Sequence, residues 1–147
     1  MSTLYELGVY TASSEIYANE VVRNLDPGRK MIRFVLSRKD CIEIKDGVYI
    51  KDLNIVKNRH AQCIFLIDNY AHSYINQADN GIPIVPFYDN GQDDELLKLQ
   101  SYLTDLSKMD DAFAFNRDYF FNEKILACRS SDEIDTLLQS RLKVSHK

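Results

Sequence analysis

The stretch Leu4-Tyr5-Glu6-Leu7-Gly8-Val9-Tyr10, followed by the polar turn Thr11-Ala12-Ser13, decides the fold of this chain. The first seven residues form an apolar, strand-like run that starts almost at the first residue. Apolar residues at helical spacing then occupy 16–25, and Asp26-Pro27-Gly28 ends that segment. A strand, a polar turn and a helix open a βαβ unit, so we expect an α/β protein built on a parallel sheet.

Further strand-like runs follow. The run Met31–Leu36 predicts a second strand, and Cys63–Ile67 is the most apolar run of the sequence. Because Cys63–Ile67 shows no alternation of apolar and polar residues, it predicts a strand buried on both faces. Asp46-Gly47 between two apolar runs predicts a β-hairpin, since a type I′ turn needs positive φ at both central residues. A hairpin inside a βα pattern indicates an insertion into the sheet.

The rest of the chain is mostly helical in pattern, apart from Ile82–Phe87, whose two prolines predict an edge strand. Ser13 or Ser14 is expected to cap the first helix. A short helix is expected over 71–77, a leucine stripe begins at Leu96, and 110–126 is aromatic-rich and helical in pattern. A last amphipathic helix is expected from about residue 131.

Composition and charge narrow the class of protein. The 147 residues are 45% hydrophobic and 27% charged, which is the balance of a globular domain. The net charge of −4 argues against direct binding to nucleic acid or to an anionic membrane, because both need a basic surface. No apolar run approaches the roughly 20 residues that span a bilayer.

The three cysteines, Cys41, Cys63 and Cys128, are odd in number and form no Cys-x-x-Cys. This pattern argues against a zinc site and against a disulfide framework. Cys41 and Cys63 lie in apolar runs, so we expect both to be buried free thiols. Free thiols fit a reducing, intracellular compartment.

Polar side chains follow three of the predicted strands. Thr11 and the pair Asp68-Asn69 fall at carboxyl ends of strands, where ligands bind in open α/β sheets. The Thr11 hydroxyl can bind a phosphate oxygen, Asp68 and Asn69 offer hard oxygen ligands for Mg²⁺, and Lys51 can neutralise a phosphoryl group. Each residue alone also has a plain structural interpretation, as a cap, a turn or a solvated charge.

The run Tyr5–Ser13 resembles the second motif of the C-terminal-domain phosphatases of the haloacid dehalogenase superfamily. This group includes the small RNA polymerase II C-terminal-domain phosphatases and the NLI-interacting-factor-like proteins. The resemblance runs from about residue 5 to residue 126. Its other segments are Leu25-Asp26-Pro27, Ser37–Cys41, Gly47–Leu53, Ile64–Asn69, Asn80–Ile84 and Asp94–Leu97.

The resemblance implies Mg²⁺-dependent hydrolysis of phosphoserine and phosphothreonine in proteins. In that family one aspartate attacks phosphorus, and a second, two residues on, acts as general acid and base. The matching positions imply that Thr11 binds phosphate and that Lys51 is catalytic and also binds phosphate. They further imply that Asp68 and Asn69 hold the metal and that Arg38 contacts the substrate.

This sequence departs from the family pattern in one decisive place. No Asp-x-Asp occurs in the 147 residues, and the family's Asp-x-Asp-x-Thr lies on the strand before Tyr5. The resemblance therefore implies a haloacid-dehalogenase-like Rossmannoid parallel sheet with a β-hairpin insertion, without its first, central strand. Residues 1–128 would form this domain and 129–147 a C-terminal helical extension. The two strands beside the gap could close on each other, take a strand from another chain, or belong to a truncated product.

Three functions stay open at this point. The first is a phosphoserine/phosphothreonine phosphatase domain, inactive as it stands because its nucleophile is absent. The second is a non-catalytic module that binds a phosphoprotein partner, or a presequence receptor of mitochondrial import within the same family. The third is a fragment with no function of its own. No transit or membrane-spanning segment is evident, so nucleus or cytoplasm is favoured over the mitochondrion.

Overall fold

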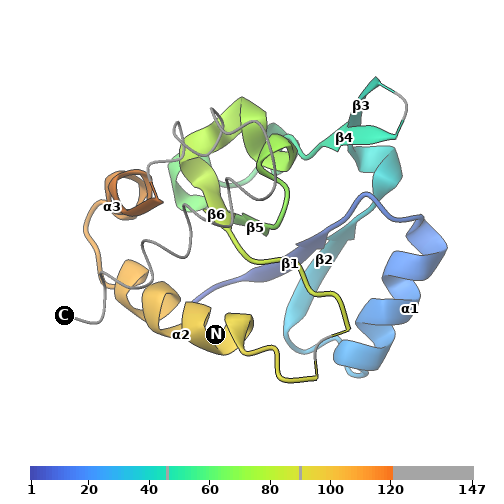
Figure 1. Cartoon of the computed structure of the whole chain (residues 1–147), viewed down its shortest axis with the longest axis horizontal. Helices are drawn as coiled ribbons and strands as arrows, with labels where there is room; N and C mark the ends of the chain where they lie inside the picture. The colour runs from blue at the N-terminus through green and yellow to red at the C-terminus, as the bar shows by residue number, and fades with distance from the viewer. Residues whose placement is uncertain (46, 90, 121–147) are drawn as a thin grey trace.

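The structure is a computed structural model that describes residues 1–45, 47–89 and 91–120 (Figure 1). It is an α/β fold, as expected, and its described strands form three two-stranded sheets. Strand β1 (Leu7–Tyr10) pairs in parallel with β2 (Ile32–Leu36), and α1 (Glu15–Leu25) connects them. This is the βαβ unit that the first 36 residues predict.

Local hydrogen bonds explain where α1 begins and ends. The Ser14 side chain caps the helix by accepting from the Tyr17 backbone N–H at 3.4 Å, so Ser14, not Ser13, is the cap. At the other end Asp26 is 3% exposed. Its carboxylate accepts backbone N–H groups of residues 30–32, the last from Ile32 at 2.8 Å. Asp26 thus ties the end of α1 to the start of β2.

The predicted hairpin is confirmed as β3 (Ile42–Lys45) paired antiparallel with β4 (Val48–Ile50). Gly47 in the turn has a φ of +79°, in the left-handed region that glycine adopts at no steric cost. Asp46 lies outside the described residues. The short β4 strand brings the chain directly to Lys51.

A second parallel pair consists of β5 (Leu66–Asp68) and β6 (Gly81–Pro83). The connection between them is η4 (Ala71–Asn80), a 3₁₀ segment with two non-helical residues inside it, where an ordinary short helix was expected. The ring of Tyr74, fully buried, lies so close over Gly81 that a Cβ there would overlap it. The Asn80 side chain donates to the carbonyls of Ala61 and Ile64 and so holds the approach to β5.

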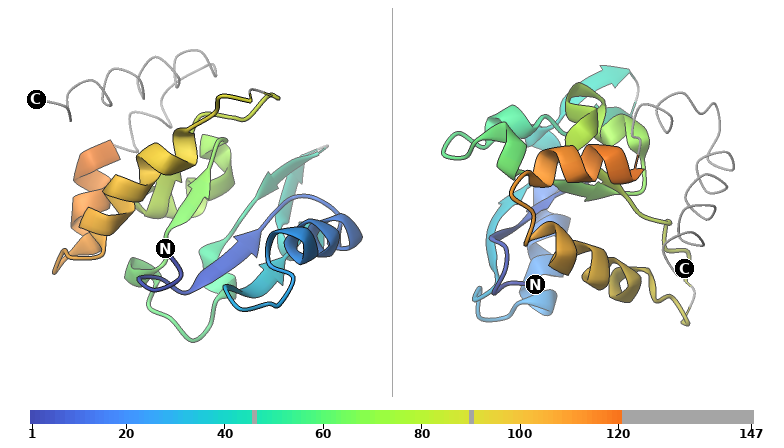
Figure 2. Two further views of the ribbon diagram at one scale, coloured as in Figure 1. Left: turned by 90° about the horizontal axis from the view of Figure 1, so that it is seen from below. Right: turned by 90° about the vertical axis from the view of Figure 1, so that its left-hand side faces the viewer.

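The main core lies around β5 and β6. Helices α2 (Glu95–Leu106) and α3 (Ala112–Phe120) lie on the opposite side of these strands from α1 (Figure 2). Their buried residues join those of η4 and the strands in one cluster. Its members are Leu53, Leu66, Ala71, Tyr74, Ile82, Leu99, Tyr102, Leu106 and Phe120.

The two parallel pairs are not joined into one sheet, which differs from the single parallel sheet that we expected. Within the described residues β1 bonds only to β2, and β5 only to β6, so direct closure of β1 on β5 is not what is found. Side chains connect the two halves instead: Tyr10 packs against the core cluster, and the Tyr5 hydroxyl donates to the Leu103 carbonyl at 2.6 Å. A missing central strand stays a prediction.

Several expectations about burial, and one about where a strand begins, were wrong. The strand expected at Cys63–Ile67 begins only at Leu66, and Cys63 belongs to an exposed 3₁₀ turn at Ala61–Cys63. Ile67 is 39% exposed, because β5 is covered on one face only. Cys41 is half-buried, and Leu96 is exposed although the leucine stripe continues into the core at later positions.

Several expectations lie outside the described residues. They are Cys128, the end of the aromatic-rich helix and the last helix, and with them the division into 1–128 and 129–147. Among the described helices, none has both the length and the apolar character needed to cross a bilayer.

Candidate functional site

The centre of the candidate site is an ion pair between Lys51 and Asp68. Lys51 follows β4 and Asp68 ends β5, and the Lys51 Nζ binds Asp68 Oδ2. The two side chains are only 12% and 5% exposed, so both charges are largely removed from water. The structure therefore brings together two residues that the sequence assigned to one site from positions 17 residues apart.

Backbone and side-chain contacts fix the segment that carries Lys51. The Lys51 backbone N–H donates to the Ser73 carbonyl at 2.8 Å. On the next two residues, the Gln77 amide donates to Asp52 Oδ1 at 2.8 Å and accepts the Leu53 N–H at 3.2 Å. The single carboxamide of Gln77 thus binds the two residues after Lys51 and holds them against η4. The role of Gln77 was not expected, because a glutamine in a helix-like segment carries no signal of such a role.

Both oxygens of Asp68 have donors. Asp68 Oδ2 binds Lys51, and Oδ1 accepts the Tyr70 backbone N–H at 2.8 Å. Tyr74 lies within electrostatic reach, and its hydroxyl is buried with no hydrogen-bond partner among the described residues. Burial first, and then the charge of Asp68, raise the pKa of Tyr74. Asn69 is half-buried beside Asp68.

Thr11 lies in the turn after β1. Its backbone N–H donates to the Leu36 carbonyl at 3.0 Å, and its Oγ1 accepts the Ser13 N–H at 3.1 Å. The Cys41 thiol lies 3.8 Å from the Thr11 carbonyl oxygen. Burial raises the pKa of that thiol, and the positive charge of Lys51 opposes the rise. Cys41 therefore lies against the Thr11 turn, a position that its apolar sequence context did not predict.

Arg38 lies beside the Thr11 turn and is exposed. Its Nε donates to the Ala12 carbonyl at 2.7 Å, and its guanidinium carbon is 5.5 Å from the centre of the Tyr49 ring. Arg38 thus links the β1 turn to the hairpin. A cation held at this edge can contact a group that approaches Thr11.

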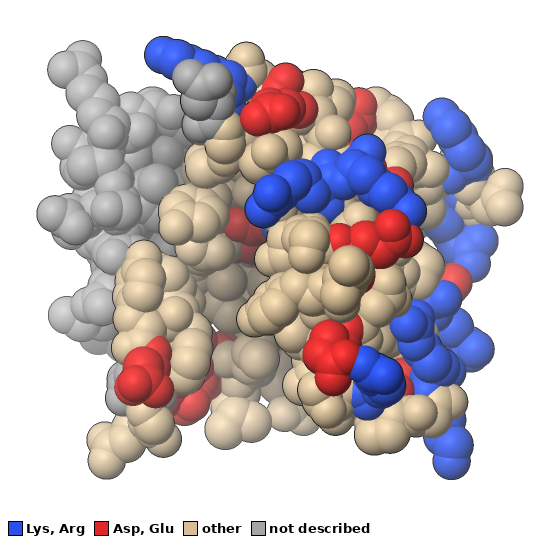
Figure 3. Space-filling view, turned by 90° about the vertical axis from the view of Figure 1, so that its right-hand side faces the viewer, with Lys and Arg blue, Asp and Glu red and all other residues tan. Residues whose placement is uncertain are grey.

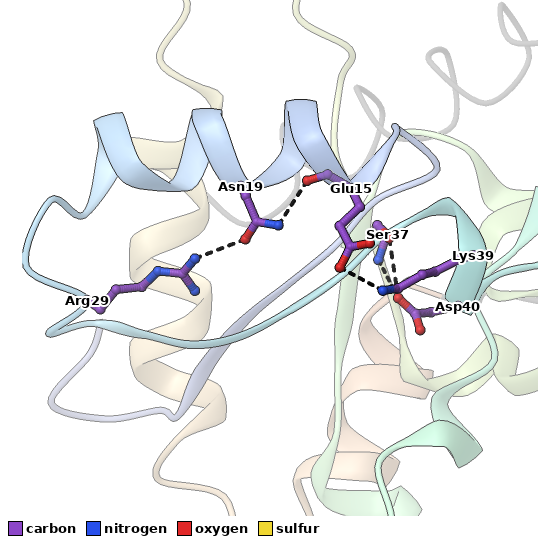
Figure 4. Close-up of polar contacts among 6 residues, drawn as sticks. All are labelled: Glu15, Asn19, Arg29, Ser37, Lys39 and Asp40. Atoms are coloured by element: carbon purple, nitrogen blue, oxygen red, sulfur yellow. Dashed lines mark hydrogen bonds and ion pairs between the residues drawn. The ribbon is translucent and has the colours of Figure 1, made fainter.

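The turn that carries Arg38 is itself held in place. The Asp40 carboxylate accepts the Ser37 N–H at 2.8 Å, and the Tyr10 hydroxyl donates to the Asp40 carbonyl at 2.6 Å. Lys39 forms an ion pair at 2.6 Å with Glu15 on α1 (Figure 4). On the face that bears α1 and the hairpin, Lys and Arg side chains lie among Asp and Glu (Figure 3). This face is thus mixed in charge rather than broadly basic.

The donors present fit part of a magnesium site. Within the described residues no group of three or more His, Cys, Asp or Glu side chains could hold a metal. Mg²⁺, however, is commonly held by one or two carboxylates together with substrate phosphate and water. Asp68 and Asn69 supply one carboxylate and one amide oxygen. These residues fit Mg²⁺ only where a phosphate supplies further ligands.

Parallel strands that end in polar turns, with an α-helical crossover between β1 and β2, define an open α/β domain, whose ligand site is expected at the carboxyl ends of the strands. The family model of the NLI interacting factor-like phosphatases matches residues 1–113, and the chain belongs to this family.

Named relatives agree with this family. The chain is 38% identical over 120 residues to the CTD small phosphatase-like protein 2 of Dictyostelium discoideum, covering 82% of this chain and 21% of that protein. It is 35% identical over 103 residues to the mitochondrial import inner membrane translocase subunit TIM50 of Candida glabrata, covering 70% of this chain and 21% of that protein. The solved structure of Fcp1, an essential RNA polymerase II CTD phosphatase, superposes with a TM-score of 0.52 at 25% identity. The match covers 82% of this chain and 34% of that chain. The chain thus spans about a fifth to a third of these proteins.

Proposed function

We propose that this chain is a protein serine/threonine phosphatase-like domain whose site binds the phosphate of a phosphoserine or phosphothreonine protein. The observation that carries the proposal is the Lys51–Asp68 ion pair, buried at the end of β5. Burial of two charges is costly. This pair lies at the carboxyl end of β5, where ligands bind in open α/β sheets. The family supports the phosphate as ligand.

Each site residue has a role in this proposal. Thr11 donates its hydroxyl to a phosphate oxygen, and Lys51 stabilises the negative charge on the phosphoryl group. Arg38 contacts the substrate from the hairpin side. Asp68 and Asn69 hold Mg²⁺ together with the phosphate, and the bound ion would reduce the repulsion between the phosphate and Asp68.

Hydrolysis needs a nucleophile that these 147 residues do not contain in the family's form. No Asp-x-Asp is present, so we expect this polypeptide to bind phosphoproteins without turning them over. A strand that carries that motif would pair with the edges of β1 and β5 that have no partner among the described residues. Binding, rather than catalysis, is thus the proposed property of the chain as given.

The proposal is tested by titration of the purified chain with a phosphoserine peptide and its unphosphorylated counterpart in the presence of Mg²⁺. We expect binding of the phosphorylated peptide only, no release of phosphate, and loss of binding in Lys51→Ala. The matched control is Lys39→Ala, which removes a lysine from an exposed ion pair and should bind normally. Magnesium-dependent release of phosphate that Lys51→Ala abolishes would contradict the expected inactivity.

A second function follows from the TIM50 relative. In this alternative the same fold binds a mitochondrial presequence, a basic amphipathic helix, instead of a phosphorylated segment. This alternative would be favoured if a presequence peptide competed with the phosphopeptide for one site. It would also be favoured if the presequence peptide bound and the phosphopeptide did not. We place the chain in the nucleus or cytoplasm, and import into mitochondria would contradict that placement.

A further inference from the structure

The Lys51–Asp68 ion pair occupies the two groups that the proposed function needs for different ligands. Lys51 is the proposed phosphate ligand and Asp68 the proposed metal ligand, yet each has the other as its partner. The remaining oxygen of Asp68 already accepts the Tyr70 N–H at 2.8 Å. Because the two side chains are only 12% and 5% exposed, neither charged group is open to a ligand while the two face each other.

The cost of breaking this contact depends on burial. If a phosphate alone attracted Lys51, the Asp68 carboxylate would stay 5% exposed with only the Tyr70 N–H as donor. If a divalent cation alone bound Asp68, it would lie beside the ammonium group of Lys51, which is itself only 12% exposed. A buried charge that loses its partner is strongly unfavourable. Each ligand alone thus leaves one buried charge uncompensated.

We infer that the Lys51–Asp68 ion pair makes the binding of phosphate and of a divalent cation mutually dependent. When both bind, Lys51 exchanges Asp68 for the phosphate and Asp68 exchanges Lys51 for the cation, so every buried charge keeps a partner. This inference rests on the proposed function, because it takes the same two ligands at the same site. It adds that the pair suppresses each ligand's binding until the other is present.

The surroundings of Lys51 allow such an exchange. Its backbone is fixed by Ser73 and by the contacts of Gln77 to the two following residues. Its side chain is a flexible four-carbon stem with a charged end, which can change partner while the backbone stays in place. The exchange therefore needs rotation of one side chain and no rearrangement of β4 or η4.

Calorimetric titration of the full chain tests this inference with two probes, sodium phosphate and magnesium chloride. Each is titrated alone and then in the presence of the other at saturation. We expect each to bind at least about tenfold more tightly when the other is present, and by the same factor, since coupling between two ligands is reciprocal.

Two variants separate the ion pair from the ligands. Asp68→Asn retains an oxygen for the Tyr70 N–H and frees Lys51, so phosphate without magnesium should bind about tenfold more tightly than to the wild type. Lys51→Met frees Asp68, so magnesium alone should bind more tightly. The control Lys39→Met breaks the exposed pair with Glu15 and should leave the coupling unchanged. Circular dichroism establishes that each variant is folded.

The outcomes distinguish this inference from the proposed function. If phosphate and magnesium both bind but independently, or if Asp68→Asn does not tighten phosphate binding, the coupling is refuted and the proposed function stands. If neither binds alone or together, both are refuted. Equal tightening by each ligand in the wild type, lost in both site variants and kept in Lys39→Met, would support the inference.

Discussion

Removal of the Gln77 side chain should destabilise the protein and loosen the segment that carries Lys51. In Gln77→Ala the Leu53 backbone N–H loses its acceptor, and Leu53 is only 4% exposed. A buried donor without a partner costs about 1–3 kcal/mol. The lost hydrogen bond to Asp52 adds only about 1 kcal/mol, because the Asn54 N–H still donates to that carboxylate.

The expected loss is therefore about 2–4 kcal/mol in the free energy of unfolding. Urea denaturation followed by circular dichroism measures it as a midpoint lowered by about 1–2 M, for a slope of about 2 kcal/mol per molar. The matched control is Gln100→Ala, since Gln100 is exposed on α2 and should change stability by less than about 0.5 kcal/mol. If Gln77→Ala is as stable as this control, Gln77 does not hold the Lys51 segment.

Three further predictions concern stability. Gly81→Ala should lower the free energy of unfolding by about 1–3 kcal/mol, because its Cβ would overlap the buried Tyr74 ring; an unchanged melting temperature would refute this. Tyr74→Phe should be neutral or stabilising in chemical denaturation, because it removes a buried hydroxyl that has no partner among the described residues, and a loss above about 1 kcal/mol would contradict this. Hydrogen bonds, first from the Ile32 N–H, lower the pKa of Asp26 in the folded state, so its ionised form stabilises the fold above the unfolded-state pKa. The stability difference between wild type and Asp26→Asn should thus shrink as pH falls below about 4, and a difference independent of pH would contradict it.

The features that the sequence predicted correctly are those encoded by neighbouring residues. The cap of α1, expected at Ser13 or Ser14, and the end of the helix at Asp26 depend on groups within a few positions, as does the turn at Gly47. The meeting of Lys51 and Asp68 followed from two strand ends and from the family pattern, and the structure pairs them. The roles assigned to Thr11, Arg38 and the metal ligands stay predictions.

The features that the sequence did not predict depend on distant neighbours. Ile67 lies in an apolar run, but its exposure is decided by whether anything packs on the second face of β5. Cys63 belongs to the same apolar run as Ile67, yet it lies in an exposed turn, because β5 begins three residues later. The hydrogen bond from Gln77 to Asp52 joins residues 25 positions apart. No repeating pattern of residues in the sequence indicates such a contact.

The separation of the two parallel pairs also has a consequence for local opening. The buried apolar cluster belongs to the β5–β6 half. In the β1–α1–β2 half, the buried apolar residues are Ala18 and Val22. Amide hydrogens of β1 and β2 should therefore exchange with solvent through cheaper, sub-global openings than those of β5 and β6. Thr11 lies on the first half and Lys51 and Asp68 on the second, so a ligand that contacts all three would slow exchange mainly in β1 and β2. Slower amide exchange in β1 and β2 would then show that the ligand is bound.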